Sequence, residues 1–238
     1  MTNPYDAAPP SARFGTEAAS ETIATFLRGV YWWMFVGLAV TALIAFAVAG
    51  SPALVNALAG NKIVFFGVII AELALVLYLS ARVATLAPST AGALFILYSA
   101  LNGVTFSFVL LAYTGASVAT AFLVTAGMFG ALAVYGSITK RDLTGLGRFM
   151  FMGLIGLVIA GVVSIFWQND AMQFVMGVVG VLVFSGLIAY DSQRLRAMAL
   201  QVQGDQAHSY AVVGALSLYL NFINLFLSLL RLFGNRRD

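Results

Sequence analysis

The sequence predicts an all-α membrane protein, a bundle of seven transmembrane helices. Of its 238 residues, 61% are hydrophobic and 9% are charged, and the mean hydropathy is +0.97. A soluble domain is about 25% charged, so a water-soluble fold of this size would need many more charges. Apolar stretches of about 20 residues, long enough to cross a membrane, recur seven times. Only helices or closed barrels span a bilayer, and the sequence lacks the alternating pattern of barrel strands.

Composition also excludes several classes of function. The chain has no cysteine and one histidine, which leaves no disulfide framework, no thiol nucleophile and too few ligands for a zinc site. The net charge of +3 does not indicate nucleic-acid binding, because Lys and Arg gather in the cytoplasmic loops of membrane proteins. The expected environment is the lipid bilayer, and no nucleic-acid partner is expected.

Residues 1–28 are a polar segment rich in Ala, Ser, Thr and Pro. They do not resemble a secretory signal, because the first apolar run begins only at Gly29 and is too long. We expect a disordered or interfacial cytosolic arm, in which residues 22–28 could begin a helix at the membrane surface.

The transmembrane domain is expected to cover residues 29–234, followed by a polar tail, 235–238. The seven expected spans are 29–50, 63–79, 91–112, 117–138, 149–167, 172–190 and 211–233. At 1.5 Å per residue, each is long enough to cross a hydrocarbon core of roughly 30 Å. The connections are too short to form a second domain.

The basic residues predict the orientation of these spans. Lys and Arg favour the cytoplasmic side, and more of them lie on the side of the N-terminal arm. That side has Arg13, Arg28, Arg82, Lys140, Arg141, Arg148, Arg194 and Arg196, and the other has Lys62, Arg236 and Arg237, with Arg231 in the last helical turn. We expect a cytosolic N-terminus and an external C-terminus. The basic end at 235–237 argues the other way, and a re-entrant last segment would return it to the cytosol.

Four polar residues at membrane depth are the first candidates for function: Glu72, Arg82, Asp191 and Asn221. Such residues are costly in lipid and normally face the bundle interior or a water path. Arg82 and Asp191 are expected at the same membrane face, where they could form an ion pair. Alternatively, both are interfacial charges that reach water.

The last span also carries a polar stripe. Its members recur at steps of three or four residues and therefore share one helix face: Gly214, Ser217, Asn221, Asn224, Ser228 and Arg231. A stripe of this length should not face lipid, so we expect this helix in the middle of the bundle. The stripe either joins helices by hydrogen bonds or lines a narrow aqueous path, and residue chemistry alone favours the former.

Known types of intramembrane enzyme do not fit the sequence. An aspartyl protease needs two facing aspartates, but the nearest partner for Asp191 is Asp205, in a loop. A serine protease needs an embedded histidine, and His208 lies in the same polar loop. A retinal protein needs a lysine in its final helix, and both lysines lie in loops. We expect neither enzymatic activity nor a cofactor.

Three segments resemble the transmembrane Bax inhibitor motif family, in its bacterial YccA-like branch. Segment 215–231, ALSLYLNFINLFLSLLR, is similar to the family's final-helix signature. Segment 188–193, IAYDSQ, is similar to the end of the sixth helix, and 72–82 to the second helix. The resemblance covers about residues 25–234. It implies a seven-helix bundle whose last helix is central and surrounded by the other six.

The resemblance also implies function. Family members are linked to pH-sensitive calcium leak and, in eukaryotes, to suppression of cell death. Bacterial relatives are linked to modulation of the membrane-bound AAA protease FtsH. The implied gate joins Asp191, the residue at 221 and Arg82. If the protein is a calcium leak, Glu72 could supply a second carboxylate along the path. Asn224 and Ser228 would add neutral oxygens, and Asp191 would make a weak, transient contact with Ca²⁺.

Asn221 stands where the family has a second aspartate. Two carboxylates in contact share a proton, which makes such a gate pH-sensitive. An asparagine donates to Asp191 without needing a proton, so we expect weaker pH dependence around neutrality.

Two functions from different classes remain open. The first is a pH-modulated calcium leak channel, with Ca²⁺ as permeant ion. The second is a modulator of an AAA protease or other inner-membrane machinery that is not a channel. The resemblance places the protein in a bacterial inner membrane.

Overall fold

The computed structural model describes residues 10–82, 85–167, 169–202 and 204–237. Within these ranges the chain forms eight helices: α1 (Pro10–Ala49), α2 (Pro52–Gly60), α3 (Lys62–Arg82), α4 (Pro88–Ala112), α5 (Gly115–Ile138), α6 (Thr144–Phe166), α7 (Asp170–Met198) and α8 (Asp205–Phe233). All except the short α2 are long and apolar enough to cross a membrane. The prediction of a seven-helix transmembrane bundle is confirmed.

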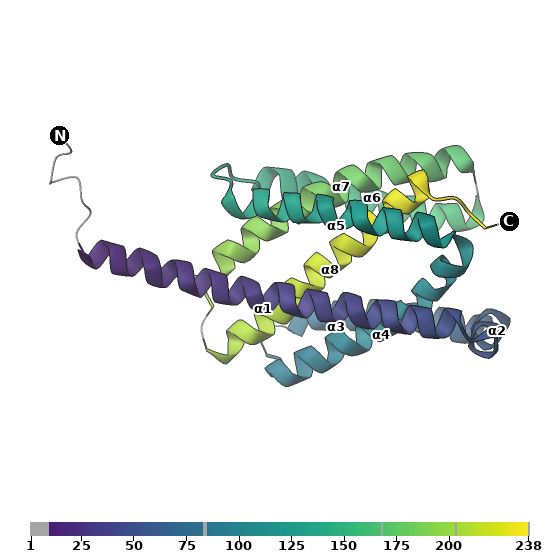
Figure 1. Ribbon diagram of the computed structural model, residues 1–238, viewed down its shortest axis with the longest axis horizontal. Coiled ribbons are helices and arrows are strands. Elements are labelled where there is room, and N and C mark those ends of the chain that lie inside the picture. Colours follow the sequence, from purple (N-terminus) through teal and green to yellow (C-terminus); the bar gives the residue numbers. More distant parts are fainter. Residues whose placement is uncertain (1–9, 83–84, 168, 203, 238) are drawn as a thin grey trace.

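Helix α1 is longer than the sequence analysis predicts. We expected residues 1–28 to be disordered or interfacial, whereas α1 begins at Pro10 and continues without a break into the first span. Pro is favoured in the first helical turn, and the following Ala and Glu residues are good helix formers. Its 40 residues extend for about 60 Å, twice the thickness of the hydrocarbon core. Figure 1 shows α1 projecting beyond the bundle at its N-terminal end. Residues 1–9 of the expected arm lie outside the described residues.

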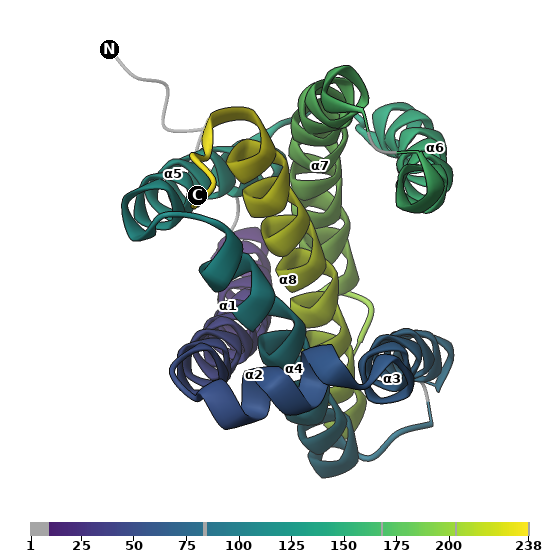
Figure 2. The ribbon, with the colours of Figure 1, turned by 90° about the vertical axis from the view of Figure 1, so that its right-hand side faces the viewer.

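Helix α8 is central, as predicted. In its apolar window 72% of the residues are buried, compared with 39% or fewer in each of the other spans. It packs against α1, α3, α4, α5 and α7, and Figure 2 shows it in the middle of the bundle. The expectation that all six other spans surround it is wrong for α6. That helix packs mainly against α7, on the outside of the molecule.

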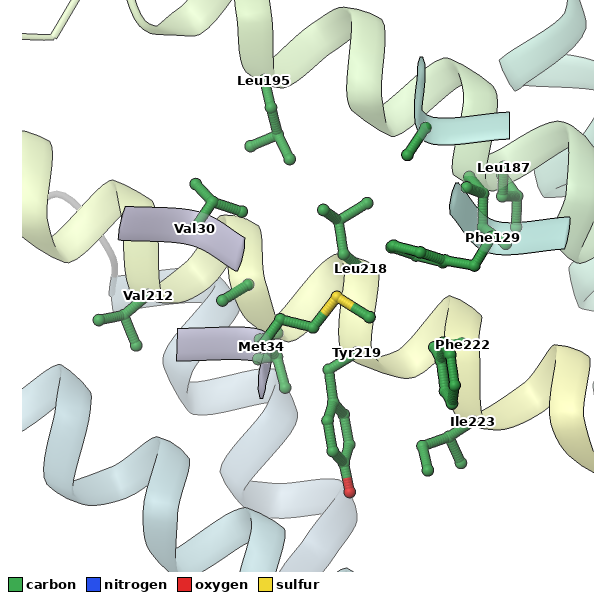
Figure 3. Close-up of a cluster of buried hydrophobic side chains, with 14 of the residues drawn as sticks. Val30, Met34, Phe129, Leu187, Leu195, Val212, Leu218, Tyr219, Phe222 and Ile223 are labelled. Atoms are coloured by element: carbon green, nitrogen blue, oxygen red, sulfur yellow. The ribbon is translucent and has the colours of Figure 1, made fainter. Parts of the chain in front are cut away.

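Side chains from several helices form the core around α8. Figure 3 shows Val30 of α1, Phe129 of α5 and Leu195 of α7 lying near Leu218 and Phe222 of α8. The rings of Phe129 and Phe222 meet edge to face, with centroids 5.6 Å apart, an arrangement that aromatic pairs favour. The core therefore holds α8 against helices on both sides.

The C-terminal segment is bound to the connection between α4 and α5. The backbone N–H of Thr114 donates to the carbonyl of Asn235, and that of Arg237 donates to the carbonyl of Ala112, at 3.0 Å each. Residues 235–237 therefore occupy a defined place at the end of the bundle opposite the start of α1 (Figure 1).

Candidate functional site

Asp191 of α7 is a buried carboxylate bound to α8. Its Oδ2 accepts hydrogen bonds from Ser217 Oγ and Asn221 Nδ2, both at 2.7 Å. Ser217 and Asn221 are one turn apart on α8, so both side chains reach the same oxygen. Asp191 is 8% exposed and Asn221 is 6% exposed. The structure thus joins two of the predicted site residues and adds Ser217 to them.

The partners of this carboxylate are neutral. A hydroxyl and an amide donate to it without supplying charge, and a buried carboxylate with neutral partners loses much of its hydration. Such a group attracts cations, which is why acidic residues within membrane helices often mark ion paths.

A hollow of about 240 Å³ reaches Asp191 from the end of the bundle where α7 ends and α8 begins. Arg194 and Tyr210 line it, together with Ser80 of α3. The hollow therefore connects one face of the bundle with the buried carboxylate, and a basic side chain stands on its wall.

A second hollow, of about 180 Å³, lies further along α8 between α6 and α7. Asn224, Ser228 and Arg231 of the polar stripe line it. Leu220 lines the first hollow and Asn224 the second, and these two residues lie one turn apart on the same face of α8. The hydrogen bonds of Asp191 therefore lie between two hollows that follow one helix face.

The far half of the stripe bonds within its own helix. Asn224 Nδ2 donates to the carbonyl of Leu220 at 2.8 Å, and Ser228 Oγ donates to the carbonyl of Asn224 at 2.7 Å. The interhelical bonds that we predicted for the stripe are found at Ser217 and Asn221.

Arg82 is not brought to Asp191. It lies exposed at the end of α3 and is not among the described residues that line the hollow, whereas Ser80 and Arg194 are. Two residues along a helix correspond to a rotation of about 200°. With Ser80 toward the hollow, Arg82 lies on the opposite face of α3.

Glu72 belongs to a different polar network, on the other side of α8. Its Oε1 accepts from Thr105 Oγ1 at 3.1 Å, and its Oε2 accepts from Asn102 Nδ2 at 3.5 Å. Tyr219 OH donates to Asn102 Oδ1 at 3.0 Å and lies 2.6 Å from Thr41 Oγ1. Tyr219 is two residues from both Ser217 and Asn221, and thus points to the opposite face of α8. The two carboxylates are therefore on opposite sides of the central helix.

The functional residues predicted from the sequence include Glu72 but omit the other members of this second network. Asn102 and Thr105 lie in the apolar segment 91–112 and satisfy the same criterion of membrane depth that selects Glu72. Tyr219 lies within the final-helix motif, but its sequence context gives no sign that its hydroxyl joins α1, α4 and α8. The role of this hydroxyl can be recognised only when the packing of the three helices is known.

The segment around Asp191 also holds a connecting loop in place. Gln193 Nε2 donates to the carbonyl of Arg141 at 2.8 Å, and its Oε1 accepts from the backbone N–H of Leu143 at 2.9 Å. In the same loop, hydrogen bonds from the Thr144 side chain and backbone hold the pKa of Asp142 below its usual range. The two hydrogen bonds of Gln193 bind the connection between α5 and α6 to α7, two residues beyond the buried carboxylate.

Among the described residues, no three His, Asp or Glu side chains gather in a group that could hold a metal ion. A calcium ion at Asp191 would meet one carboxylate and neutral oxygens. Tight calcium sites use six to eight oxygen ligands, so these residues fit a passing, partly hydrated ion.

Comparison with known proteins agrees with the family resemblance found in the sequence. The sequence profile of the family described as "Inhibitor of apoptosis-promoting Bax1" matches residues 23–238. The Inner membrane protein YbhL of Escherichia coli is 48% identical over 218 residues, which cover 90% of this chain and 93% of the relative. An uncharacterized protein of Caulobacter vibrioides is 45% identical, covering 90% and 89% of the two chains. One of Deinococcus radiodurans is 43% identical, covering 92% and 93%.

Proposed function

This chain belongs to the Bax inhibitor-1 family of integral membrane proteins, and on that premise we propose that it is a gated calcium leak channel. The gate is the contact of Asp191 with Ser217 and Asn221. The protein acts without a cofactor and without catalysis, and Ca²⁺ is the permeant ion. The name of the Escherichia coli relative supports a bacterial inner membrane as its location.

One observation carries this proposal: a buried carboxylate lies between two hollows on the polar face of the central helix. Hydrogen bonds to charged groups contribute about 1.5–3 kcal/mol each. Two such bonds favour the closed state by a few kcal/mol, which leaves a small open population. When α7 moves away from α8, Asp191 is released to attract a cation from the first hollow.

The other candidate residues take different parts in this proposal. Asn224 and Ser228 supply neutral oxygens in the second hollow. Arg194 lines the entrance hollow, whereas Arg82, the basic residue that the family resemblance implies, stands outside it. We assign Glu72 to bracing α3 and α4 through Thr105 and Asn102, on the other side of α8.

Calcium flux into proteoliposomes that contain only this protein tests the proposal. We expect Asp191→Asn to abolish flux, because the neutral amide no longer attracts the cation. The matched control is Asp170→Asn, the same exchange at an exposed position in the first turn of α7. Ser217→Ala removes one of the two closing bonds and should raise flux. Wild-type flux in Asp191→Asn would refute the channel.

The pH dependence of flux tests the role of Asn221. Asn221→Asp places a second carboxylate against Asp191, and such a pair shares a proton. The variant should therefore show a steeper change of flux with pH near neutrality than the wild type. Identical pH profiles would remove this part of the proposal.

A specific observation favours a second candidate function, modulation of a membrane-bound AAA protease. Helix α1 projects beyond the bundle (Figure 1). A cleft of about 580 Å³ lies between its early turns, near Glu21 and Phe26, and the first turn of α8, at His208. A projecting helix beside a cleft offers a surface to a partner. Absence of flux together with co-purification of the protease would favour this function over the channel.

A further inference from the structure

An apolar groove of about 430 Å³ lies on the side of the bundle away from α6 and α7. Helix α1 forms one wall at Ala42, helix α5 forms the other at Ala119, and Phe106, Phe222 and Phe226 line the groove between them. Figure 2 shows α1 and α5 on the same side of α8. Thr41 also lines the groove, but its hydroxyl is bonded to Tyr219 and Ser99. The surface offered to an occupant is therefore apolar.

The groove has the length of a leaflet. Its lining residues on α1 run from Leu38 to Phe46, which corresponds to about 12 Å of helix. One leaflet contributes roughly 15 Å to the hydrocarbon core. The small side chains of Ala42 and Ala119 are exposed and leave room for an acyl chain between the two walls.

A basic residue stands at one end of this groove. Arg237 lines it beside Gly115, at the start of α5. The backbone of Arg237 is bonded to Ala112, and that of Asn235 donates to Ser117 Oγ at 2.9 Å. The C-terminal segment is thus fixed where a lipid phosphate would lie when the acyl chain fills the groove.

We propose that this groove binds one anionic phospholipid, with an acyl chain between α1 and α5 and its phosphate at Arg237. An arginine recognises phosphate through charge-assisted hydrogen bonds, and an apolar groove that ends at a single cation complements a molecule with an apolar chain and an anionic head. The site lies on the other side of α8 from Asp191. Lipid binding can therefore be tested independently of calcium flux.

Native mass spectrometry of the full chain in mild detergent tests the proposal, with phosphatidylglycerol and phosphatidylethanolamine as probes. We expect one tightly bound lipid, with phosphatidylglycerol preferred. Arg237→Gln should weaken phosphatidylglycerol binding about threefold to fivefold, as expected for loss of an exposed charge pair. The control Arg236→Gln alters a neighbouring exposed arginine and should leave binding unchanged.

A second pair of variants tests the acyl-chain part of the site. Ala42→Leu fills the groove and should weaken binding of both lipids about tenfold. Ala47→Leu makes the same change at an exposed position of α1 that does not line the groove, and should bind lipid as the wild type does. Equal binding by these two variants would show only annular lipid and overturn the proposal. A dimer that Ala42→Leu dissociates, with no bound lipid, would make a second copy the occupant and also overturn it.

Discussion

The hydroxyl of Tyr219 lies within hydrogen-bonding distance of two oxygens, those of Thr41 and Asn102, but has only one proton to donate. Thr41 Oγ1 lies within hydrogen-bonding distance of the Ser99 carbonyl at 2.9 Å and of Tyr219 OH at 2.6 Å, and Tyr219 OH donates to Asn102 at 3.0 Å. Each hydroxyl donates once. When Tyr219 donates to Asn102, Thr41 can donate to Tyr219 only in place of its bond to the Ser99 carbonyl. With Thr41 donating to Tyr219, the bonds run in one direction, from α1 through α8 and α4 to the carboxylate of Glu72.

We predict that Tyr219→Phe lowers the free energy of unfolding by about 1–3 kcal/mol, because it leaves Asn102 Oδ1 without its buried donor. Thermal unfolding in detergent measures the effect. The control is Tyr98→Phe, which removes the hydroxyl of a buried tyrosine that packs against Tyr219. The described residues give that hydroxyl no hydrogen-bond partner. Equal losses in the two variants would contradict the role assigned to Tyr219.

At the scale of the helices, hydropathy predicts the spans but not the full elements. Each of the seven expected spans coincides with an observed helix, although 29–50 and 149–167 run one residue past the ends of α1 and α6. Helix α7, by contrast, continues from its apolar part to Met198. Hydropathy identifies only the part of a helix that lies in lipid. The polar residues that follow the apolar span of α7 are still helical, so the helix is longer than the span. The short helix α2 is missed for a related reason, since it begins at Pro52 and lies wholly within the expected loop of residues 51–62.

The candidate site is predictable only in part, because side-chain contacts depend on how each helix is rotated. Asp191 and Asn221 follow from membrane depth, the polar stripe and the family resemblance. The rotation of α3, which turns Ser80 toward the hollow and Arg82 away, leaves no signal in the sequence. The separation of Glu72 from Asp191 by α8 is likewise a result of packing.

The crossing of α5 and α7 depends on a glycine. A Cβ at Gly136 would overlap the backbone carbonyl of Ala189, whereas a Cβ at Gly130 on the same helix would meet nothing within 4 Å. We predict that Gly136→Ala lowers the free energy of unfolding by about 1–3 kcal/mol, since backbone atoms must move apart. Gly130→Ala should leave stability unchanged or slightly raised. Unfolding in denaturing detergent measures both, and a stable Gly136→Ala variant would contradict this close crossing.

For the molecule as a whole, the direction of insertion decides which hollow faces the cytosol. The entrance to Asp191 lies at the end where α7 ends and α8 begins, and α5 also ends there. Basic residues on that side of the bundle predict that this end is cytosolic. The groove at Arg237 would then lie in the outer leaflet.

The two lysines of the chain allow this orientation to be tested without removing any residue. Lys62 and Lys140 are both exposed, and three spans separate them. They must therefore lie on opposite sides of the membrane. We predict that an amine reagent that cannot cross membranes modifies Lys62 in intact spheroplasts, and Lys140 only after permeabilisation, as measured by peptide mass spectrometry.

One further lysine tests the last span by the same experiment. Arg236→Lys retains the charge at an exposed position and places an amine beyond α8. When α8 crosses the whole membrane, this lysine reacts together with Lys62 in intact spheroplasts. When the last segment is re-entrant, it reacts with Lys140 after permeabilisation, and the external C-terminus is refuted. Modification of Lys140 before permeabilisation would reverse the whole bundle and place the entrance to Asp191 outside the cell.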